Sequence, residues 1–156
     1  MPLKGIPAHI SPELLYALSK MGHGDRIVVS DRNFPSDSVA AHTVTKVPIR
    51  VFGSTAEVLK DILKLIPLDP YCNTPVCVMD RVESDKARDL AVPAYDQIGN
   101  VVTGETYSGH PYGPATFPLI HLERSEFYEA AKAAYCIVQT TDHSPYANVI
   151  ISKGVL

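Results

Sequence analysis

Apolar positions recur at helical spacing in three stretches of the chain. The first, residues 11–21, opens on Ser-Pro-Glu and then repeats leucines and a methionine three or four positions apart. A serine N-cap, a proline at the first helical position and an acidic first turn are typical of a helix start, and the glycine that follows is a natural stop. The second stretch, 54–66, opens on Ser-Thr-Ala-Glu, the pattern of a capping box, and ends before Pro67. The third, 125–135, has Ser125 as its expected cap.

Between these helical stretches lie short runs of hydrophobic residues. They are RIVVS, PVCVMD and CIVQTTD, which start at residues 26, 75 and 136, with a last strand expected in YANVIISKGVL and a less regular one at 47–52. Runs without alternation are typical of strands buried on both faces of a sheet. The alternation of helices and strands predicts an α/β fold: one compact domain over residues 1–156, with a central, largely parallel or mixed sheet flanked by helices.

Residues 81–118 do not follow this pattern. The segment is rich in glycine, proline, tyrosine and charge, and its last part, GETYSGHPYGPATFP, shows no periodicity. We therefore expect a long loop here, and a loop of that length in a compact domain usually carries function or an interface.

Composition narrows the classes of function. The 156 residues are 46% hydrophobic and 20% charged, and the net charge of −3 gives no reason to expect nucleic acid or an anionic membrane as a partner. No apolar run approaches the roughly 20 residues of a membrane span, and the first residues lack the apolar stretch of a signal peptide. The three cysteines show no zinc-binding spacing, and Cys77 and Cys136 fall in expected buried strands. We therefore expect a reduced, cytoplasmic protein.

Polar side chains gather where the expected elements begin or end. His23 precedes the first strand and Asp31 follows it; the other candidates are Asp69, Met79, Arg124, Tyr128, Tyr146 and Asn148. Ligand sites of α/β proteins form at such strand ends. An imidazole, carboxylates, phenols, an amide and a guanidinium are typical of a carbohydrate site, where sugar hydroxyls take paired hydrogen bonds and the ring lies on an apolar surface.

Each candidate also has a simpler interpretation. His23 stands between two glycines, which present an imidazole well and bury it poorly, but it would equally cap the end of the first helix. Asp31 before RNFP and Asp69 in LDPY suit turns. Tyr128 suits the rim of a core, and Arg124 suits a solvated surface. The other histidines have no metal-ligand spacing, and the chain has no nucleophile elbow, P-loop or dinucleotide fingerprint.

Several of these stretches together resemble one family. MGHGD, the strand that ends in Ser-Asp, the NFP turn, FYEAAKAA and YANVIISKGV occur in the order seen in the fucose mutarotase and ribose pyranase family. The resemblance implies a cytoplasmic sugar mutarotase that needs no cofactor and interconverts the anomers of a free monosaccharide. It also implies a compact α/β fold that assembles into homo-oligomeric rings, commonly pentamers stacked as a decamer, with sites near the subunit interfaces.

The resemblance also implies roles for single residues. His23 matches the catalytic proton donor and Tyr128 a catalytic tyrosine; the positions that match sugar ligands are Asp31, Asp69, Met79, Arg124, Tyr146 and Asn148. Mutarotation opens the hemiacetal, lets the aldehyde rotate and recloses it on either face. One group must therefore protonate the ring oxygen while another takes the proton of the anomeric hydroxyl, and a histidine that titrates near neutrality is suited to either step.

The sugar itself stays open between two branches of the family. GHGD, the NFP turn and Phe-Tyr-Glu favour L-fucose, whereas SPYAN at 144–148 is more similar to the ribose branch. RVFGST at 50–55 and TTDHS at 140–144 depart from the family pattern, and 95–118 match none of it. We expect a mutarotase acting on L-fucose or a related deoxyhexose. The alternatives are a D-ribose pyranase, a non-catalytic sugar-binding or transport accessory protein, and a structural ring-forming protein; His23 and Tyr128 together favour the enzyme.

Overall fold

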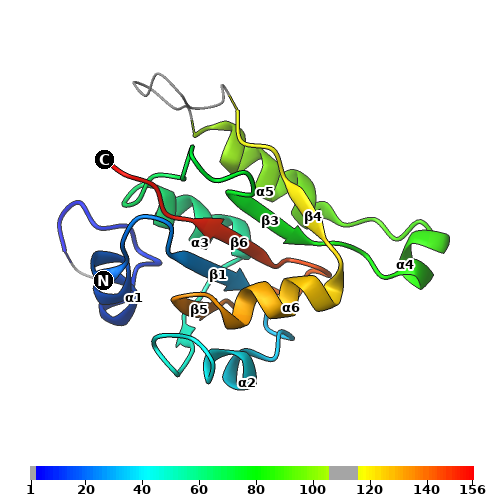
Figure 1. Cartoon of the computed structure of the whole chain (residues 1–156), viewed down its shortest axis with the longest axis horizontal. Coiled ribbons are helices and arrows are strands. Elements are labelled where there is room, and N and C mark those ends of the chain that lie inside the picture. Colours follow the sequence, from blue (N-terminus) through cyan, green and yellow to red (C-terminus); the bar gives the residue numbers. More distant parts are fainter. Residues whose placement is uncertain (1–2, 106–115) are drawn as a thin grey trace.

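The chain folds around one mixed sheet, which a computed structural model describes for residues 3–105 and 116–156. Its strand order is β2-β5-β1-β6-β3-β4 (Figure 1). The strands are β1 (Arg26–Ser30), β2 (Ile49–Arg50), β3 (Val76–Met79), β4 (Ile120–Leu122), β5 (Cys136–Gln139) and β6 (Val149–Ser152). The sequence predicted an α/β fold with a largely parallel or mixed sheet, and this prediction is confirmed.

The direction of each strand decides which side chains can meet. β6 runs antiparallel to both of its neighbours, β1 and β3, whereas the pairs β1–β5, β2–β5 and β3–β4 are parallel. All the described strands except β6 therefore end at the same side of the sheet, which we call the carboxyl edge, and begin at the opposite side, the amino edge. β6 begins at the carboxyl edge and ends at the amino edge.

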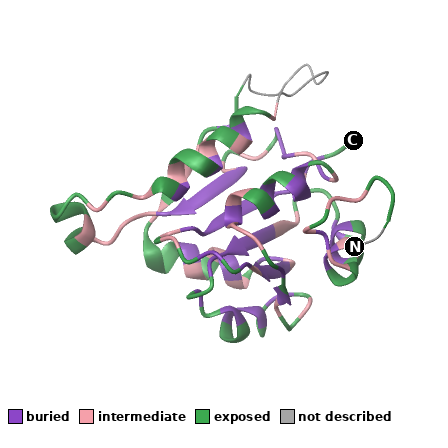
Figure 2. Cartoon of the chain, turned by 180° about the vertical axis from the view of Figure 1, so that it is seen from behind, coloured by how far each residue is buried: buried purple, intermediate pink, exposed green. Residues whose placement is uncertain are grey.

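Helices cover both faces of the sheet. They are α1 (Pro12–Lys20), α2 (Ser36–Ala40), α3 (Thr55–Leu63), α4 (Glu83–Ala87), α5 (Pro93–Thr103) and α6 (Arg124–Lys132). Two apolar clusters form the core, one with α1, α3 and α5, the other with α2 and α6. Ile27 and Val29 of β1 enter the first cluster and Val28 the second, so strands without apolar–polar alternation are buried on both faces (Figure 2).

Local signals in the sequence account for several helix ends. Ser11 accepts the backbone N–H of Leu14 and caps α1, and Ser54 and Glu57 form the predicted capping box of α3. The prediction of Ser125 as the cap of α6 was wrong. The cap is Glu123, whose carboxylate accepts the backbone N–H of Ser125. An acidic cap also complements the positive end of the helix dipole.

The expected loop over 81–118 was also wrong in large part. Residues 83–87 form α4, and α5 is a helix of 11 residues that buries Ala94, Ile98 and Val102 in the core. α2 was not predicted, and the strand expected at 47–52 shortens to two residues. Most of GETYSGHPYGPATFP, including His110, lies outside the described residues. Among the described helices, none has the length and apolar character needed to cross a membrane.

Candidate functional site

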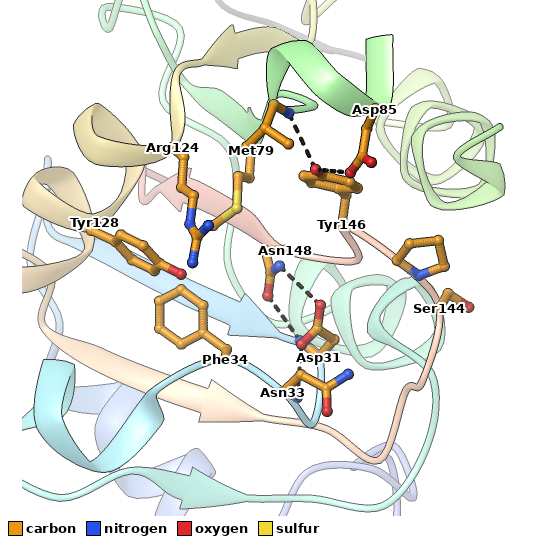
Figure 3. Close-up of a pocket in the computed structure, with 12 residues that line it drawn as sticks. Asp31, Asn33, Phe34, Met79, Asp85, Arg124, Tyr128, Ser144, Tyr146 and Asn148 are labelled. Atoms are coloured by element: carbon orange, nitrogen blue, oxygen red, sulfur yellow. Dashed lines mark hydrogen bonds between the residues drawn. The ribbon is translucent and has the colours of Figure 1, made fainter. Parts of the chain in front are cut away.

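A cavity of about 350 Å³ opens at the carboxyl edge of the sheet (Figure 3). Six of the eight candidates from the sequence line it: Asp31, Met79, Arg124, Tyr128, Tyr146 and Asn148. They come from the ends of β1 and β3, the first turns of α6 and the segment that leads into β6. These segments are far apart in the sequence and meet because β6 runs against its neighbours, which brings its first residues to the edge where β1 and β3 end.

Asp31 and Asn148 form a buried couple in the wall of this cavity. Asn148 Oδ1 accepts the backbone N–H of Asp31 at 3.0 Å, and Asn148 Nδ2 donates to Asp31 Oδ2, also at 3.0 Å. The other carboxylate oxygen accepts the backbone N–H of Asn33 at 2.9 Å. Burial raises the pKa of the Asp31 carboxyl, against the opposing effect of these hydrogen bonds. The couple is therefore a fixed polar group that needs no rearrangement to meet a ligand.

Arg124 and Tyr128 lie one turn apart on α6 and point into the same space (Figure 3). The guanidinium carbon lies 5.6 Å from the centre of the Tyr128 ring, and a hydrogen bond with Tyr128 raises the pKa of Arg124. The ring of Phe34 lies 5.6 Å from that of Tyr128. A cation and a phenol thus stand beside an aromatic surface, the combination that a sugar ring with polar edges and an apolar face requires.

Tyr146 adopts a backbone conformation that is rare for a bulky residue, with φ of 57°. Its hydroxyl donates to Asp85 Oδ2 at 2.5 Å and accepts the backbone N–H of Val82 at 3.2 Å. Burial, and next the hydrogen bond to Asp85, raise the pKa of the Tyr146 phenol. These hydrogen bonds hold the segment around α4, which we call the α4 arm, against the residues that lead into β6.

Sequence reasoning missed Asp85, which also lines the cavity. It lies in the segment that was expected to be a loop, and α4 buries no residue, so no apolar periodicity pointed to it. Asn33 and Phe34 line the cavity as well, and their only signal in the sequence was the NFP motif.

His23 and Asp69 do not line the cavity. His23 precedes β1 and therefore lies at the amino edge, where its Nε2 is 3.1 Å from Asp69 Oδ1. β1 separates His23 from Asp31, and its five residues span roughly 16 Å. Within one chain the eight candidates thus form two groups. Among the described residues, no group of three or more His, Cys, Asp and Glu side chains is arranged to hold a metal ion.

Comparison with known proteins identifies the family. The model of the RbsD / FucU transport protein family matches residues 4–156, and the chain belongs to this family. Human fucose mutarotase is 42% identical over 155 residues, which cover 99% of this chain and 94% of the relative. The structure of FucU from Bifidobacterium longum superposes with a TM-score of 0.84 at 37% identity, covering 98% of this chain and 99% of that one. The fucose mutarotase of Streptococcus pneumoniae, solved in complex with L-fucose, gives 0.79 at 34% identity and covers 99% of both chains.

Proposed function

We propose that this protein is an L-fucose mutarotase, an isomerase that interconverts the α and β anomers of the free sugar with one domain over residues 1–156 and no cofactor. The observation that carries the proposal is the cavity at the carboxyl edge, in which the Asp31–Asn148 couple and Arg124 face a space beside Phe34. The similarity over nearly the whole chain to proteins named fucose mutarotase supports it.

The cavity residues fit the parts of a monosaccharide. Asp31 Oδ2 and Asn148 offer acceptors and donors side by side, which suits neighbouring sugar hydroxyls. Phe34 and Met79 supply the apolar surface for the face of the ring. Arg124 places a positive charge beside the Tyr128 hydroxyl, where negative charge develops if that phenol gives up its proton during catalysis.

Ring opening needs one group to give a proton to the ring oxygen while another takes one from the anomeric hydroxyl. We assign the first role to Tyr128, whose phenol gives its proton to the ring oxygen, and the second to His23, whose neutral imidazole takes the proton of the anomeric hydroxyl; the two roles exchange on reclosure. Positioned general acids and bases contribute about 10²- to 10⁴-fold each. A modest acceleration is sufficient, because the free sugar already mutarotates slowly in water.

This assignment requires two copies of the chain at each site. Within one chain the cavity and His23 lie at opposite edges of the sheet, and the His23 side chain is 46% exposed. We propose that the amino edge of one protomer meets the carboxyl edge of the next and brings His23 to the sugar. When each protomer contacts the next through two different surfaces, the copies form a closed ring if the rotation from one protomer to the next brings the last copy back to the first. This agrees with a homo-oligomer built as a pentameric ring or a decamer.

We also place the protein in the cytoplasm. Its three cysteines are free thiols, with Cys77 and Cys136 buried in the core. Free thiols are typical of a reducing compartment. The monosaccharide and further copies of the chain are the partners that this proposal includes.

The test is NMR of anomeric exchange with L-fucose and D-ribose, compared for the wild type and His23→Ala. His42→Ala, at an exposed histidine outside the cavity, is the control. We expect the wild type and the control to accelerate exchange of L-fucose above the buffer rate and His23→Ala to lose this activity. Faster exchange of D-ribose would move the protein to the other branch of the family, and exchange at the buffer rate for both sugars would overturn the catalytic proposal.

A further inference from the structure

The histidine at the amino edge stands on a fixed turn. Residues 22–25 close on themselves, since the Asp25 N–H donates to the Gly22 carbonyl at 3.2 Å and the Gly22 N–H donates to Asp25 Oδ2 at 2.7 Å. Gly24 has φ of 83° and donates its N–H to the carbonyl of Lys153, the residue after β6. Because the backbone on both sides of His23 is held, the orientation of the imidazole depends on what its ring contacts.

Asp69 is held at least as firmly and is buried. Its N–H donates to the Ser152 carbonyl at 3.0 Å, and Leu68 pairs with Lys153 in an isolated bridge. At Gly154 a Cβ would lie 2.4 Å from the Leu68 carbonyl oxygen, so the two segments approach as closely as a glycine allows. The Asp69 side chain is only 6% exposed. The backbone around Asp69 therefore fixes the place of its carboxylate.

One oxygen of the Asp69 carboxylate is engaged by two neighbours. Asp69 Oδ1 accepts the backbone N–H of Tyr71 at 3.0 Å and lies 3.1 Å from His23 Nε2. The Tyr71 ring meets the imidazole edge-on, with 5.8 Å between ring centres. The carboxylate and the phenol ring therefore contact His23 together and fix the plane of its ring.

We infer that Asp69 is a positioning residue for His23. The inference rests on the proposed function, because it assigns His23 the proton transfer. An ionised carboxylate only accepts hydrogen bonds, so the neutral imidazole must carry its proton on Nε2. Nδ1 is then the nitrogen that faces away from Asp69 and exchanges protons with the substrate. The position that the family resemblance matched to a sugar ligand thus sets the tautomer of the catalytic histidine.

The chain contains a matched control for this pair. His9 Nδ1 lies 2.7 Å from Asp61 Oδ2, and Asp61 also accepts a hydrogen bond from Lys64. This second histidine–aspartate pair joins the N-terminal segment to α3 and does not line the cavity. Asp69→Asn and Asp61→Asn therefore make the same change of charge at two pairs, of which only the first is expected to affect catalysis.

The first arm of the test needs no activity. The 15N shifts of the imidazole nitrogens show which one carries the proton. In the neutral wild type we expect the proton of His23 on Nε2, and a wild-type His23 protonated on Nδ1 would overturn the inference without any variant. In Asp69→Asn, whose neutral amide can donate as well as accept, we expect a mixture of tautomers at His23 and unchanged signals at His9, which also report that the variant is folded. A His23 tautomer unaffected by Asp69→Asn would likewise overturn it.

The second arm is kinetic and uses the anomeric exchange of L-fucose. We expect Asp69→Asn to lower kcat by about 10- to 100-fold, the usual effect of removing an orienting partner, with KM changed less than about twofold. Combined with His23→Ala it should add almost nothing, because the two residues act as a unit. A sugar ligand would instead raise KM and add its effect to that of His23→Ala. If the wild type fails to accelerate exchange, the proposed function fails while the 15N result still decides the role of Asp69.

Discussion

The two edges of the sheet differ in how much of the chain each needs to build its group. The carboxyl edge holds a cavity to which the ends of β1 and β3, the α4 arm, α6 and the start of β6 all contribute. The amino edge holds one half-exposed imidazole and one buried carboxylate. Recognition of a sugar requires many groups that converge on one space, whereas proton transfer requires a single group in the right orientation. A single oriented group is also the part that a neighbouring protomer can supply across an interface.

The largest effect on the rate of mutarotation is expected when His23 is substituted in one chain and Tyr128 in another. Alone, His23→Ala and Tyr128→Phe should each lower mutarotation by about 10²- to 10⁴-fold, as for loss of a general acid or base. After the two variants are unfolded together and refolded as a mixture, about a quarter of the sites should combine an intact His23 with an intact Tyr128, if sites lie between protomers. The measurement is anomeric exchange by NMR before and after mixing.

A mixture that stays as inactive as its components would show that each site lies within one chain. The control is each variant refolded alone, which should stay inactive. A recovery well above a quarter would contradict a site that draws on only two neighbours.

The next largest effect is on the free energy of unfolding. It distinguishes the apolar cluster beside the cavity, with α2 and α6, from the cluster on the other face of the sheet, with α1, α3 and α5. Phe127 is fully buried and packs edge-on against Phe34, which in turn lines the cavity. Phe127→Ala should lower the free energy of unfolding by about 3–5 kcal/mol. Because Phe34 loses its support, the affinity for L-fucose should also fall. Urea denaturation and a sugar titration by NMR measure the two effects.

Ile62→Ala is the matched control on the other face. Ile62 is fully buried in the cluster of α1, α3 and α5 and does not line the cavity. Its loss should cost about 2–5 kcal/mol and leave sugar affinity unchanged. Equal losses of affinity in both variants would show that the cavity responds to global stability and not to Phe34.

A smaller effect is expected from strain in the His23 turn. Gly24 and Gly5 both have φ of 83° and open space where a Cβ would stand. Alanine at either position should therefore cost about 1–2 kcal/mol through backbone strain alone. Only Gly24→Ala should lower kcat, since it shifts the turn that carries His23. An identical kcat for Gly24→Ala and Gly5→Ala would show that the turn does not set the position of the imidazole.

The smallest effect is a pH dependence at the carboxyl edge. Burial raises the pKa of Asp31 in the folded chain above the ordinary value of 3.8. At pH values between the pKa of the unfolded chain and that of the folded chain, the folded state therefore binds more protons than the unfolded state. The contribution of this group to stability is therefore present below the unfolded pKa and is lost as pH rises through the folded pKa. Asp31→Asn removes that loss.

The test is urea denaturation of both proteins from below pH 4 to pH 7. We expect the free energy of unfolding of Asp31→Asn to increase relative to that of the wild type as pH rises across this interval, so that the variant becomes relatively more stable. A difference that stays constant with pH would contradict a raised pKa at Asp31.

Local sequence predicted those features that depend on neighbouring residues. The caps at Ser11 and Ser54 and the buried strands are encoded within a few positions, and they were identified. α5 was missed because Gly99, Val101 and Val102 disfavour a helix in isolation, and the helix is stabilised by packing its apolar face into the core.

The candidate site was predictable as a set of residues but not as two groups. Which edge a strand end occupies depends on the direction of each strand, and nothing in YANVIISKGVL shows that β6 runs against its neighbours. His23 and Asp31 lie only eight positions apart in the sequence, and β1 places them at opposite edges. Asp85 gave no signal because its contact with Tyr146 joins residues that are 61 positions apart.

The reversed strand also has a consequence for directed evolution. β6 is fully buried, its first residue follows Asn148, and its last precedes Lys153, which holds the His23 turn. A change within β6 would therefore be transmitted to sugar recognition and to proton transfer at once, so selection for a new sugar there would carry a catalytic penalty. Two short segments outside β6, residues 82–85 and 144–146, supply side chains to the cavity. Libraries for altered sugar preference should accordingly be built in these two segments.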